Sequence, residues 1–356
     1  MIYKGIGLMS GTSLDGLDIA FVHFTHKNNA WTFEITKAET VAYPSEISDK
    51  LRNIYFGTAL ELADFHNTYG KWIGYQVNQF IQDFDTPHFI ASHGHTIFHR
   101  PELGFSLQIG SGAHIYAQTG ITTVCDFRSV DVALNGQGAP LVPKGDQELF
   151  KDFDYLVNIG GIANITHNKS SRAFDITIAN MALNELANER NLDYDPNGDL
   201  AKSGKVNEIL LEQLNNLPFE KGVFGKSLGR EFYEKEFKPI IDSFNISLEE
   251  KLHTVCRHIA FMFRKAVSVF SETENNKMQI SGGGVLNNFL VECIRKELPE
   301  LQIVIPERKI IEFKEALIFA FLGLLRLRNE SNCLKTVTGA TSDALGGAIY
   351  GPSSVI

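Results

Sequence analysis

The stretch GLMSGTSLDGLDIA, from Gly7 to Ala20, sets a run of glycine, hydroxyl and carboxylate residues between two apolar segments. These segments, Ile2–Leu8 and Leu17–Phe24, alternate as β-strands do, and Trp31–Thr40 continues with a rough period of two. Three consecutive strands with tight connections predict an antiparallel meander. The polar run, Ser10–Gly16, is then the first turn of that meander.

The residues of this first turn suit phosphate binding. Glycines allow a tight turn whose N–H groups and hydroxyls converge on phosphate oxygens, and Asp15 or Asp18 could face a magnesium ion or its waters. An ordinary hairpin turn is the alternative for any such run taken alone. A dinucleotide-binding fingerprint does not fit, because its third glycine position is Ser10.

The same order of elements recurs in the second half of the chain, about 150 residues later. After the meander, the first half predicts a helix within Glu61–Phe84 and a strand over His88–Ser92. The second half predicts three strands and then a helix, namely Asp154–Gly161, Ala163–Asn168, Arg172–Thr177 and Asn180–Asn188. This repetition predicts duplicated α/β units rather than a solenoid of short repeats.

Two further glycine turns follow strands in the second half. NIGG ends with Gly160 and Gly161, and SGGG contains Gly282, Gly283 and Gly284 before an amphipathic helix. Glycines at such positions let a ligand approach the backbone, and free N–H groups at a helix start favour anions. Together with the first turn, these loops predict one nucleotide site.

The composition argues against a nucleic-acid-binding, exported or membrane-spanning protein. The 356 residues include 33 Lys and Arg against 42 Asp and Glu, a formal charge of −9, so a nucleic-acid partner is not expected. The four cysteines form no Cys-x-x-Cys pair, which suits a reducing cytoplasm. We expect neither an export signal nor a membrane span, because the most apolar late run, Ala316–Leu325, falls short of the ~20 residues that cross a bilayer. That run predicts a buried helix.

Histidines beside the predicted strand at His88–Ser92 are candidates for a ligand site. SHGHTIFHRP holds His93, His95 and His99, which suit a catalytic metal, a polar wall against substrate, or structural hydrogen bonding. Gly94 argues against metal binding, because it interrupts the strand between the first two histidines.

Two other charged positions have open alternatives. Arg128 could hold a carboxylate or phosphate through its bidentate fork, or form a salt bridge with Asp126 or Asp131. Asp175 follows an apolar strand and precedes a helix, so it could act as a general base or cap the start of that helix.

Together, these motifs resemble those of the anhydro-N-acetylmuramic acid kinase family, part of the superfamily of sugar kinases, actin and heat-shock chaperones. The resemblance covers essentially the whole chain, and GLMSGTSLDGLDIA is its most specific part. The other motifs follow in the family's order: SHGHTIFHRP, LQIGSGAHIYAQTGITTVCDFRSVDVALNGQGAPLVP, LVNIGGIANIT, SGGGVLN and TVTGATSDALGGAIY.

The resemblance implies a fold and a reaction. The fold is α/β, with two actin-like (ribonuclease H-like) ATPase domains around a central cleft, residues 1–140 with 336–356 and residues 141–335. In the reaction, ATP and water open the 1,6-anhydro bond of 1,6-anhydro-N-acetylmuramic acid and yield its 6-phosphate, a step of cell-wall recycling. ATP and Mg²⁺ are the implied cofactors, an amino sugar is the partner, and a homodimer is the default assembly.

The resemblance also assigns residues to this reaction. Asp175 is the expected base that activates water, and His93, Arg128 and Asp131 are expected along the sugar; no protein residue is assigned as a direct metal ligand. The expected ATP contacts come from the three glycine turns, namely Gly11, Thr12, Ser13, Leu14, Asp15, Gly16, Leu17, Asp18, Gly160, Gly161, Gly282, Gly283 and Gly284.

Two segments depart from the family pattern. One is VFGKSLG at Val223–Gly229, where the family tends to have two prolines before Lys-Ser-Thr-Gly. The other follows Asp175. The family usually has Asp-Thr-Gly-Pro-Gly-Asn where this chain has Asp175, then Ile-Thr-Ile-Ala, then Asn180. These departures leave open a kinase for a different sugar and a non-catalytic or chaperone-like ATP-binding protein of the actin fold. The histidine run leaves open a metal-dependent hydrolase built on His93, His95 and His99.

Overall fold

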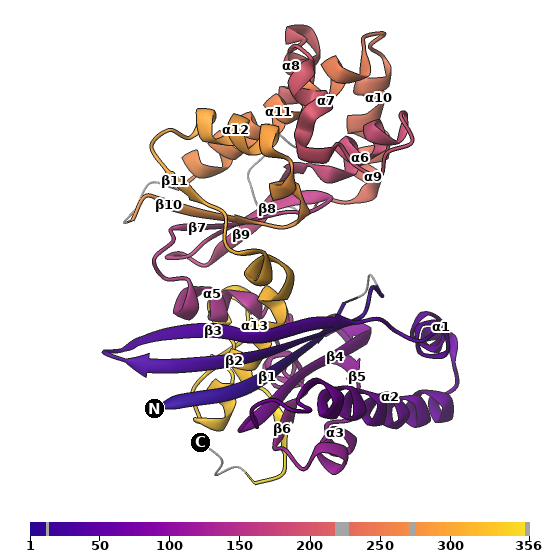
Figure 1. The fold of residues 1–356 in the computed structure, drawn as a ribbon, viewed down its shortest axis with the longest axis vertical. Helices are drawn as coiled ribbons and strands as arrows, with labels where there is room; N and C mark the ends of the chain where they lie inside the picture. Colours follow the sequence, from indigo (N-terminus) through magenta and orange to yellow (C-terminus); the bar gives the residue numbers. More distant parts are fainter. Residues whose placement is uncertain (12–13, 218–227, 271–274, 353–356) are drawn as a thin grey trace. The chain divides into compact units, whose positions relative to one another are not determined.

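The computed structural model describes residues 1–11, 14–217, 228–270 and 275–352. The chain forms two compact units, both of mixed α/β structure (Figure 1). Unit 1 comprises Met1–Phe150 and Arg308–Ile356, and unit 2 comprises Lys151–Glu307.

Unit 1 is built on a mixed sheet whose strand order is β12-β6-β4-β1-β2-β3, with β5 paired to β4. The pairs β1/β2 and β2/β3 are antiparallel, which confirms the predicted meander, and β1/β4 and β4/β6 are parallel. The strands are β1 Ile2–Ser10, β2 Leu17–Lys27, β3 Ala30–Val41, β4 Phe89–Arg100, β5 Phe105–Ile109, β6 Thr123–Cys125 and β12 Ala348–Tyr350.

Unit 2 repeats this arrangement. Its strand order is β11-β10-β7-β8-β9, with β7/β8 and β8/β9 antiparallel and β7/β10 and β10/β11 parallel. Strand β7 therefore occupies the place of β1, and β10 that of β4. The strands are β7 Tyr155–Ile159, β8 Ile162–His167, β9 Arg172–Ile178, β10 Lys277–Ser281 and β11 Gln302–Val304. The predicted α/β duplication is confirmed.

Helices cover both faces of the sheet in unit 1. Alternate side chains of β1, Ile6 and Leu8, belong to the same buried core as Phe65 and Tyr69 of α2, whose start is closed by a capping box at Thr58. The opposite face of the sheet contacts α13. The helices of unit 1 are α1 Ser45–Asn53, α2 Ala59–Phe80, α3 Gly112–Thr119, α4 Ser129–Ala133, α5 Val142–Leu149, α13 Arg308–Leu327 and α14 Lys335–Thr338, with 3₁₀ turns η1 Ile54–Phe56 and η2 Pro101–Leu103.

In unit 2, the predicted helix Asn180–Asn188 is α6 with the same bounds. The long helix α11 contacts α6, α7, α8 and α12. The remaining helices are α7 Asp199–Ser203, α8 Glu208–Asn215, α9 Arg230–Phe232, the π-helix η5 Tyr233–Phe237, α10 Lys238–Asp242, α11 Leu248–Ser268 and α12 Asn288–Glu297, with 3₁₀ turns η3 Pro196–Gly198 and η6 Gly283–Leu286. None of the helices in the described parts of the chain is long and apolar enough to cross a membrane.

The bounds of unit 1 differ from the expected 1–140 and 336–356. Both α5 and α13 contact strand β3, and α13 also contacts β1, β2 and β4, so these helices belong to unit 1. Lys314 of α13 forms an ion pair with Asp146 of α5. The predicted buried helix at Ala316–Leu325 is confirmed, since all of these residues are buried within α13.

Helix α13 approaches the central strand β1 so closely that no side chain fits between them at Gly7. A Cβ atom there would lie 1.8 Å from the carbonyl oxygen of Ala316 and 3.1 Å from the Cβ of Ala320. The carbonyl belongs to the helix backbone, so it cannot move aside as a flexible side chain would. Glycine at this position is therefore a requirement of the packing between α13 and β1.

We expect Gly7→Ala to destabilise unit 1, because α13 must shift to admit the methyl group. Overpacking of this kind costs about 2 kcal/mol, which corresponds to a fall of about 4–8 °C in Tm. Thermal unfolding followed by circular dichroism measures the change. A matched control is Gly104→Asn, at φ +80° with nothing within 4 Å of the added Cβ, where asparagine accepts the left-handed backbone. Equal Tm values for Gly7→Ala and the parent protein would contradict the packing argument.

Candidate functional site

Three strands of unit 1 end side by side. Because β1, β4 and β6 are parallel, Ser10 lies opposite His95, and Ser92 lies opposite Cys125. The segments that follow these strands therefore gather at one edge of the sheet, which is where open α/β sheets bind ligands. The predicted first turn after β1 and the motifs SHGHT and CDFRS meet at this edge.

The first turn joins β1 to β2 through Gly11–Gly16, and Asp18 follows it in β2. Thr12 and Ser13 lie outside the described residues. Leu14 has φ 62°, a left-handed conformation that non-glycine residues seldom adopt and that clusters at functional sites. Leu17 belongs instead to the buried core of the sheet. Gly11, Asp15, Gly16 and Asp18 line a pocket of about 480 Å³, together with Thr40 and Glu315.

Carboxylates dominate this pocket. Asp18 accepts a hydrogen bond from Thr40 at 2.6 Å; burial raises the pKa of Asp18, and the neighbouring Asp15 charge adds to the rise. Partial desolvation and the Asp18 carboxylate raise the pKa of Glu315. Glu315 was not among the predicted site residues, although a carboxylate at the start of the apolar run of α13 was a signal that could have found it.

A divalent cation that accompanies ATP fits this set of oxygen donors. Carboxylate oxygens are ligands that Mg²⁺ accepts, and the mutual repulsion of Asp15 and Asp18 favours a cation between them. No group of three or more His, Cys, Asp or Glu side chains arranged to hold a metal by themselves was found in the described parts of the chain. A cation here would share its coordination with phosphate oxygens and water, as Mg²⁺ commonly does.

Arg128 lies after β6 and contacts His93 rather than a carboxylate. Its Nη2 lies 2.8 Å from Nε2 of His93, and its Nη1 donates to the carbonyl of Gly138 at 2.6 Å. Within the described residues Arg128 forms no ion pair, so the alternative of a salt bridge to Asp126 or Asp131 is wrong. A half-buried guanidinium with N–H groups to spare is suited to an incoming anion.

His93 is held as a neutral hydrogen-bond acceptor. Its Nδ1 contacts the carbonyl of Gly94 at 2.9 Å, so the ring proton resides on Nδ1 and Nε2 accepts from Arg128. Burial and the Arg128 charge lower the pKa of His93 to about 3. The ring also packs against Phe319 of α13, with centroids 4.5 Å apart. His93 therefore positions Arg128 and does not act as an acid or base near neutral pH.

Asp131 is fully buried at the start of α4. One carboxylate oxygen accepts from the backbone N–H of Gly138 at 2.7 Å, and the other accepts from Thr338 at 2.7 Å and contacts the Cys333 thiol at 3.1 Å. Both oxygens are thus used inside unit 1. Asp131 therefore fixes the backbone at Gly138, and the carbonyl oxygen of Gly138 accepts a hydrogen bond from Arg128.

The three histidines do not converge. Gly94 has φ +73°, which breaks the alternation of β4, so His93 packs against α13 while His95 contacts Ser10 at 2.9 Å. His99 contacts Ser106 at 3.1 Å. Their separate partners, and the Arg128 cation at His93, do not support the alternative of a metal-dependent hydrolase.

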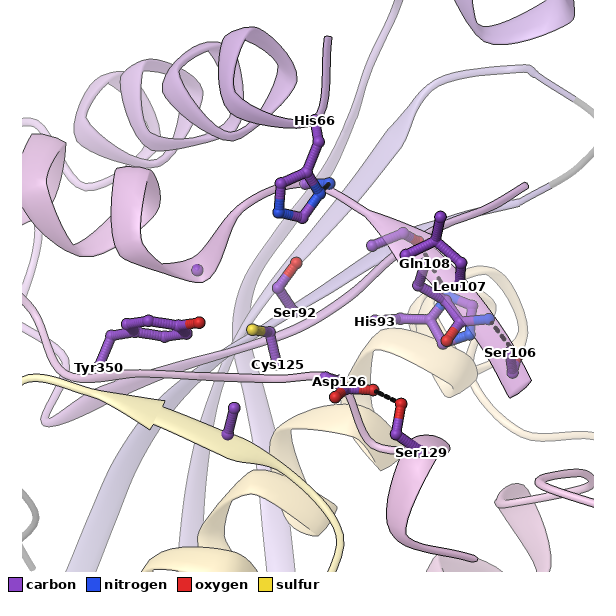
Figure 2. Close-up of a pocket in the computed structure, with 14 residues that line it drawn as sticks. His66, Ser92, His93, Ser106, Leu107, Gln108, Cys125, Asp126, Ser129 and Tyr350 are labelled. Atoms are coloured by element: carbon purple, nitrogen blue, oxygen red, sulfur yellow. Dashed lines mark hydrogen bonds between the residues drawn. The ribbon is translucent and has the colours of Figure 1, made fainter. Parts of the chain in front are cut away.

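A second pocket, of about 220 Å³, lies beside the ends of β4 and β6 (Figure 2). His66 of α2, Ser92, His93, Gln108, Cys125 and Asp126 contribute to its wall. Asp126 has φ 58°, a second left-handed non-glycine residue at this edge, and it accepts a hydrogen bond from Ser129 at 2.5 Å. The sequence indicated Asp126 only as a salt-bridge partner and did not indicate His66, Ser92 or Gln108.

In unit 2, Asp175 lies on β9 beside a bulge, opposite Asn164 of β8. Its Oδ2 accepts a hydrogen bond from the backbone N–H of Leu228 at 2.7 Å. Burial raises the pKa of Asp175 above its ordinary value of 3.8, and the bond from Leu228 opposes part of this rise. The alternative that Asp175 caps α6 is wrong, because the first N–H groups of that helix donate to the carbonyls of Gly160 and Gly161.

Of the two segments that depart from the family pattern, the run after Asp175 is part of the core of unit 2, whereas residues 223–227 of the other lie outside the described residues. Ile176, Thr177 and Ile178 complete β9 and are fully buried, as is Ala179. β-Branched residues suit such a strand end. Because side chains alternate along a strand, Asp175 remains half-buried beside these residues, and Asn180 still begins α6. The altered residues are therefore part of the strand and its core, and Asp175 next to them accepts the hydrogen bond from Leu228.

The glycines of unit 2 are of two kinds. Gly282 has φ +84°, and a Cβ at Gly284 would lie 2.2 Å from Ile159, so the fold itself requires both glycines. At Gly160, Gly161 and Gly283, an added Cβ would meet nothing closer than 3.5 Å. Packing within the protein therefore does not explain why these three positions are glycine. Gly283 and Gly284 also line a pocket of about 160 Å³ with Asn180, Tyr194, Asp195 and Asn287.

Comparison with known proteins identifies relatives along the whole chain. The model of the family "Anhydro-N-acetylmuramic acid kinase" matches residues 3–352. The anhydro-N-acetylmuramic acid kinase of Photobacterium profundum is 32% identical and covers 98% of this chain and 99% of the relative. That of Saccharophagus degradans is 34% identical and covers 98% of each chain.

The solved structures that match this chain share less of its sequence. The activator of 2-hydroxyisocaproyl-CoA dehydratase from Clostridium difficile, with bound ADPNP, is 15% identical with a TM-score of 0.43, over 89% of this chain and 92% of that one. Component A of the (R)-2-hydroxyglutaryl-CoA dehydratase from Acidaminococcus fermentans is 12% identical with a TM-score of 0.45, over 89% and 96%. The family match and the two full-length relatives show that this chain belongs to the anhydro-N-acetylmuramic acid kinase family.

Proposed function

We propose that this protein is an ATP-dependent kinase that opens 1,6-anhydro-N-acetylmuramic acid with water and phosphorylates the freed oxygen. Water adds to the anomeric carbon and gives its proton to Asp175, while the bond from that carbon to O6 breaks. O6 takes the γ-phosphoryl group, and ADP leaves. Family membership supports the substrate class, and the described residues support the roles given below.

The observation that carries the proposal is the environment of Asp175. A general base must be ionised near neutral pH and yet basic enough to take a proton. Burial raises the pKa of Asp175, which increases its basicity, while the hydrogen bond from Leu228 keeps the carboxylate oriented and favours its ionised form. No competing cation pairs with Asp175 among the described residues.

The phosphates of ATP are assigned to the first turn of unit 1 and the start of β2, from Gly11 to Asp18. Asp15 and Asp18 would hold Mg²⁺, which neutralises the repulsion between these carboxylates and the phosphate oxygens. The proposed contacts in unit 2 are the backbones of Gly160, Gly161 and Gly283, where open space takes the place of a side chain. Gly282 and Gly284 shape this second region through the fold.

The anionic carboxylate of the muramic acid side chain is assigned to Arg128. This guanidinium has spare N–H groups, and His93 and the Gly138 carbonyl fix its plane. A preset plane lowers the entropic cost of binding a planar carboxylate. In this proposal Arg128 contacts the sugar, whereas His93 and Asp131 position Arg128.

We expect Gly161→Ala to weaken ATP binding without unfolding the protein. The added methyl group has room in the free protein, where its nearest neighbour is 3.7 Å away, but it occupies space that the ligand needs. KM for ATP should rise about tenfold at an unchanged Tm. Gly284→Ala is the matched control, because its methyl group collides with Ile159 and should lower Tm. An unchanged KM for ATP in Gly161→Ala would remove this turn from the ATP site.

The direct test is ADP release from Mg²⁺-ATP, with and without 1,6-anhydro-N-acetylmuramic acid, and identification of the sugar product by mass. The parent protein should release ADP only with the sugar and yield the 6-phosphate. Asp175→Asn should lower kcat at least about a hundredfold, because the amide cannot accept the proton, while ATP affinity is retained. The exposed Asp152→Asn is the control and should be fully active. ATP binding without product in the parent protein would favour the non-catalytic alternative.

The pH dependence follows from the protonation state of Asp175. The carboxylate is active only when ionised, and its pKa is raised, so kcat/KM should fall on acidification. This fall should begin at a higher pH than for an ordinary aspartate with a pKa of 3.8. A profile of kcat/KM from acidic to neutral pH measures the effect. A flat profile down to the ordinary aspartate range would exclude Asp175 as the base.

A further inference from the structure

A chain of hydrogen-bonded hydroxyls reaches the last residue of β1, directly before the first turn. Ser10 is 2% exposed, and its Oγ accepts a hydrogen bond from the Tyr43 hydroxyl at 2.7 Å and lies 2.9 Å from Nδ1 of His95. The Tyr43 hydroxyl lies 3.1 Å from the hydroxyl of Tyr69 in α2. The proposed reaction gives none of these four side chains a role.

The hydrogen bonds of this chain run in one direction. Tyr43 donates to Ser10, so it accepts from Tyr69, and Ser10 donates to Nδ1 of His95. Burial raises the pKa of both tyrosines, which keeps them protonated as donors, and it lowers the pKa of His95, which keeps the ring neutral as an acceptor. The hydroxyls of Tyr43 and Ser10 therefore each donate one bond and accept one, and hydrogen bonds in such chains strengthen one another.

The segment Thr40–Tyr43, at the end of β3 and after it, also holds the far end of the first turn. Thr40 donates a hydrogen bond to Asp18 at 2.6 Å. A Cβ atom at Gly16 would lie 2.7 Å from Cγ2 of Thr40 and 2.7 Å from the carbonyl oxygen of Val41, so the segment lies directly against the turn. One short segment thus contacts the residue before the turn, the turn itself and the carboxylate after it.

The backbone of the turn needs this support. Leu14 has φ 62°, and such a conformation persists only where the surrounding structure holds it. Leu14 and Tyr43 both pack against the buried core that contains Tyr69. The Trp72 ring stacks on Tyr69 and also meets Tyr43, with centroids 5.8 and 5.4 Å apart. Rigid aromatic packing therefore fixes the two tyrosines whose hydroxyls lead to the turn.

We infer that Tyr43 and His95 are positioning residues for the ATP phosphates, because they fix Ser10 and with it the backbone of the turn that starts at Gly11. The inference rests on the proposed function, in which this turn binds the phosphates. Among the described residues, neither Tyr43 nor His95 lines the pocket of the turn, so both act through Ser10 and not by contact with ATP. A turn that is already ordered binds phosphate at a lower entropic cost.

The first test measures the Kd of Mg²⁺-ATP by isothermal titration calorimetry without sugar. Tyr43→Phe keeps the ring and removes the hydroxyl, so Ser10 and Tyr69 each lose a partner. The Kd should rise about tenfold, the effect of one buried hydrogen bond that is lost with its partners left unpaired. KM for the sugar should change less than about twofold, because the sugar does not bind to this turn.

Tyr3→Phe is the matched control. Tyr3 is buried at the opposite end of β1, and its hydroxyl accepts a hydrogen bond from Arg328 at 2.6 Å. The same substitution there removes a hydroxyl of similar burial and should lower Tm without a change in the Kd of ATP. If Tyr43→Phe lowers Tm but binds ATP as the parent protein does, the hydroxyl is merely structural and the inference is overturned.

A pair of substitutions at His95 gives an independent test. His95→Leu removes the acceptor of the Ser10 hydroxyl, whereas His95→Asn places an amide oxygen near the position of Nδ1. The Kd of ATP should rise about tenfold in His95→Leu, and His95→Asn should recover most of that loss. A role in packing alone predicts the reverse order, because leucine fills a buried site better than asparagine. Weaker ATP binding by His95→Asn than by His95→Leu would contradict the inference.

The outcomes for the parent protein separate this inference from the proposed function. If the parent protein does not bind Mg²⁺-ATP, the proposed function fails, and the positioning role fails with it. If it binds Mg²⁺-ATP but does not phosphorylate the sugar, the proposed reaction fails, while the titrations of the Tyr43 and His95 variants still decide whether these residues support the turn.

Discussion

The close contact between α13 and β1 at Gly7 is the constraint on which unit 1 depends. With no side chain between them, the backbone of a helix from residues 308–327 rests on the central strand of a sheet made by the first part of the chain. The same helix brings Phe319 against His93 and Glu315 to the pocket of Gly11 and Asp18. A helix distant in sequence therefore completes both the core and the ligand edge of unit 1, because the glycine removes the distance that a side chain would impose.

Two kinds of unusual residue gather at the edge of unit 1 where ligands are proposed to bind: residues with a buried polar atom that lacks a hydrogen-bond partner, and residues with a left-handed backbone. Ser92 and Gln108 each leave a buried polar atom without a partner in the described parts of the chain, and Leu14 and Asp126 adopt left-handed backbone conformations. In contrast, the polar groups that support the edge are fully bonded: the buried carboxylate of Asp131 accepts three contacts. A site that must exchange water for ligand keeps free donors and acceptors, whereas its support does not.

Much of the fold could be predicted from the sequence because its signals are local. The alternation in Leu17–Phe24 and the glycine turn before it identified the meander, and the recurrence of this order identified the second unit. The partners of charged residues were harder to predict. Asp131 lies three residues from Arg128 in sequence, yet the two side chains do not bond to each other. Asp131 bonds to Thr338, and Arg128 bonds to His93, because tertiary packing places these residues from distant segments within hydrogen-bond distance. The buried strand end at Ile176–Ala179 could likewise not be distinguished from an altered loop.

The sequence by itself determined the two strand meanders, the duplication and the family, since each depends on residue types at short and regular spacings. Only the tertiary structure decided which glycines serve the fold and which leave room for a ligand, as Gly284 and Gly161 illustrate. It also decided that Arg128 faces a neutral imidazole and that Ser92 faces a pocket. The physical reason is that burial, hydrogen-bond satisfaction and free volume are properties of atoms brought together from distant parts of the chain, and a linear pattern does not contain them.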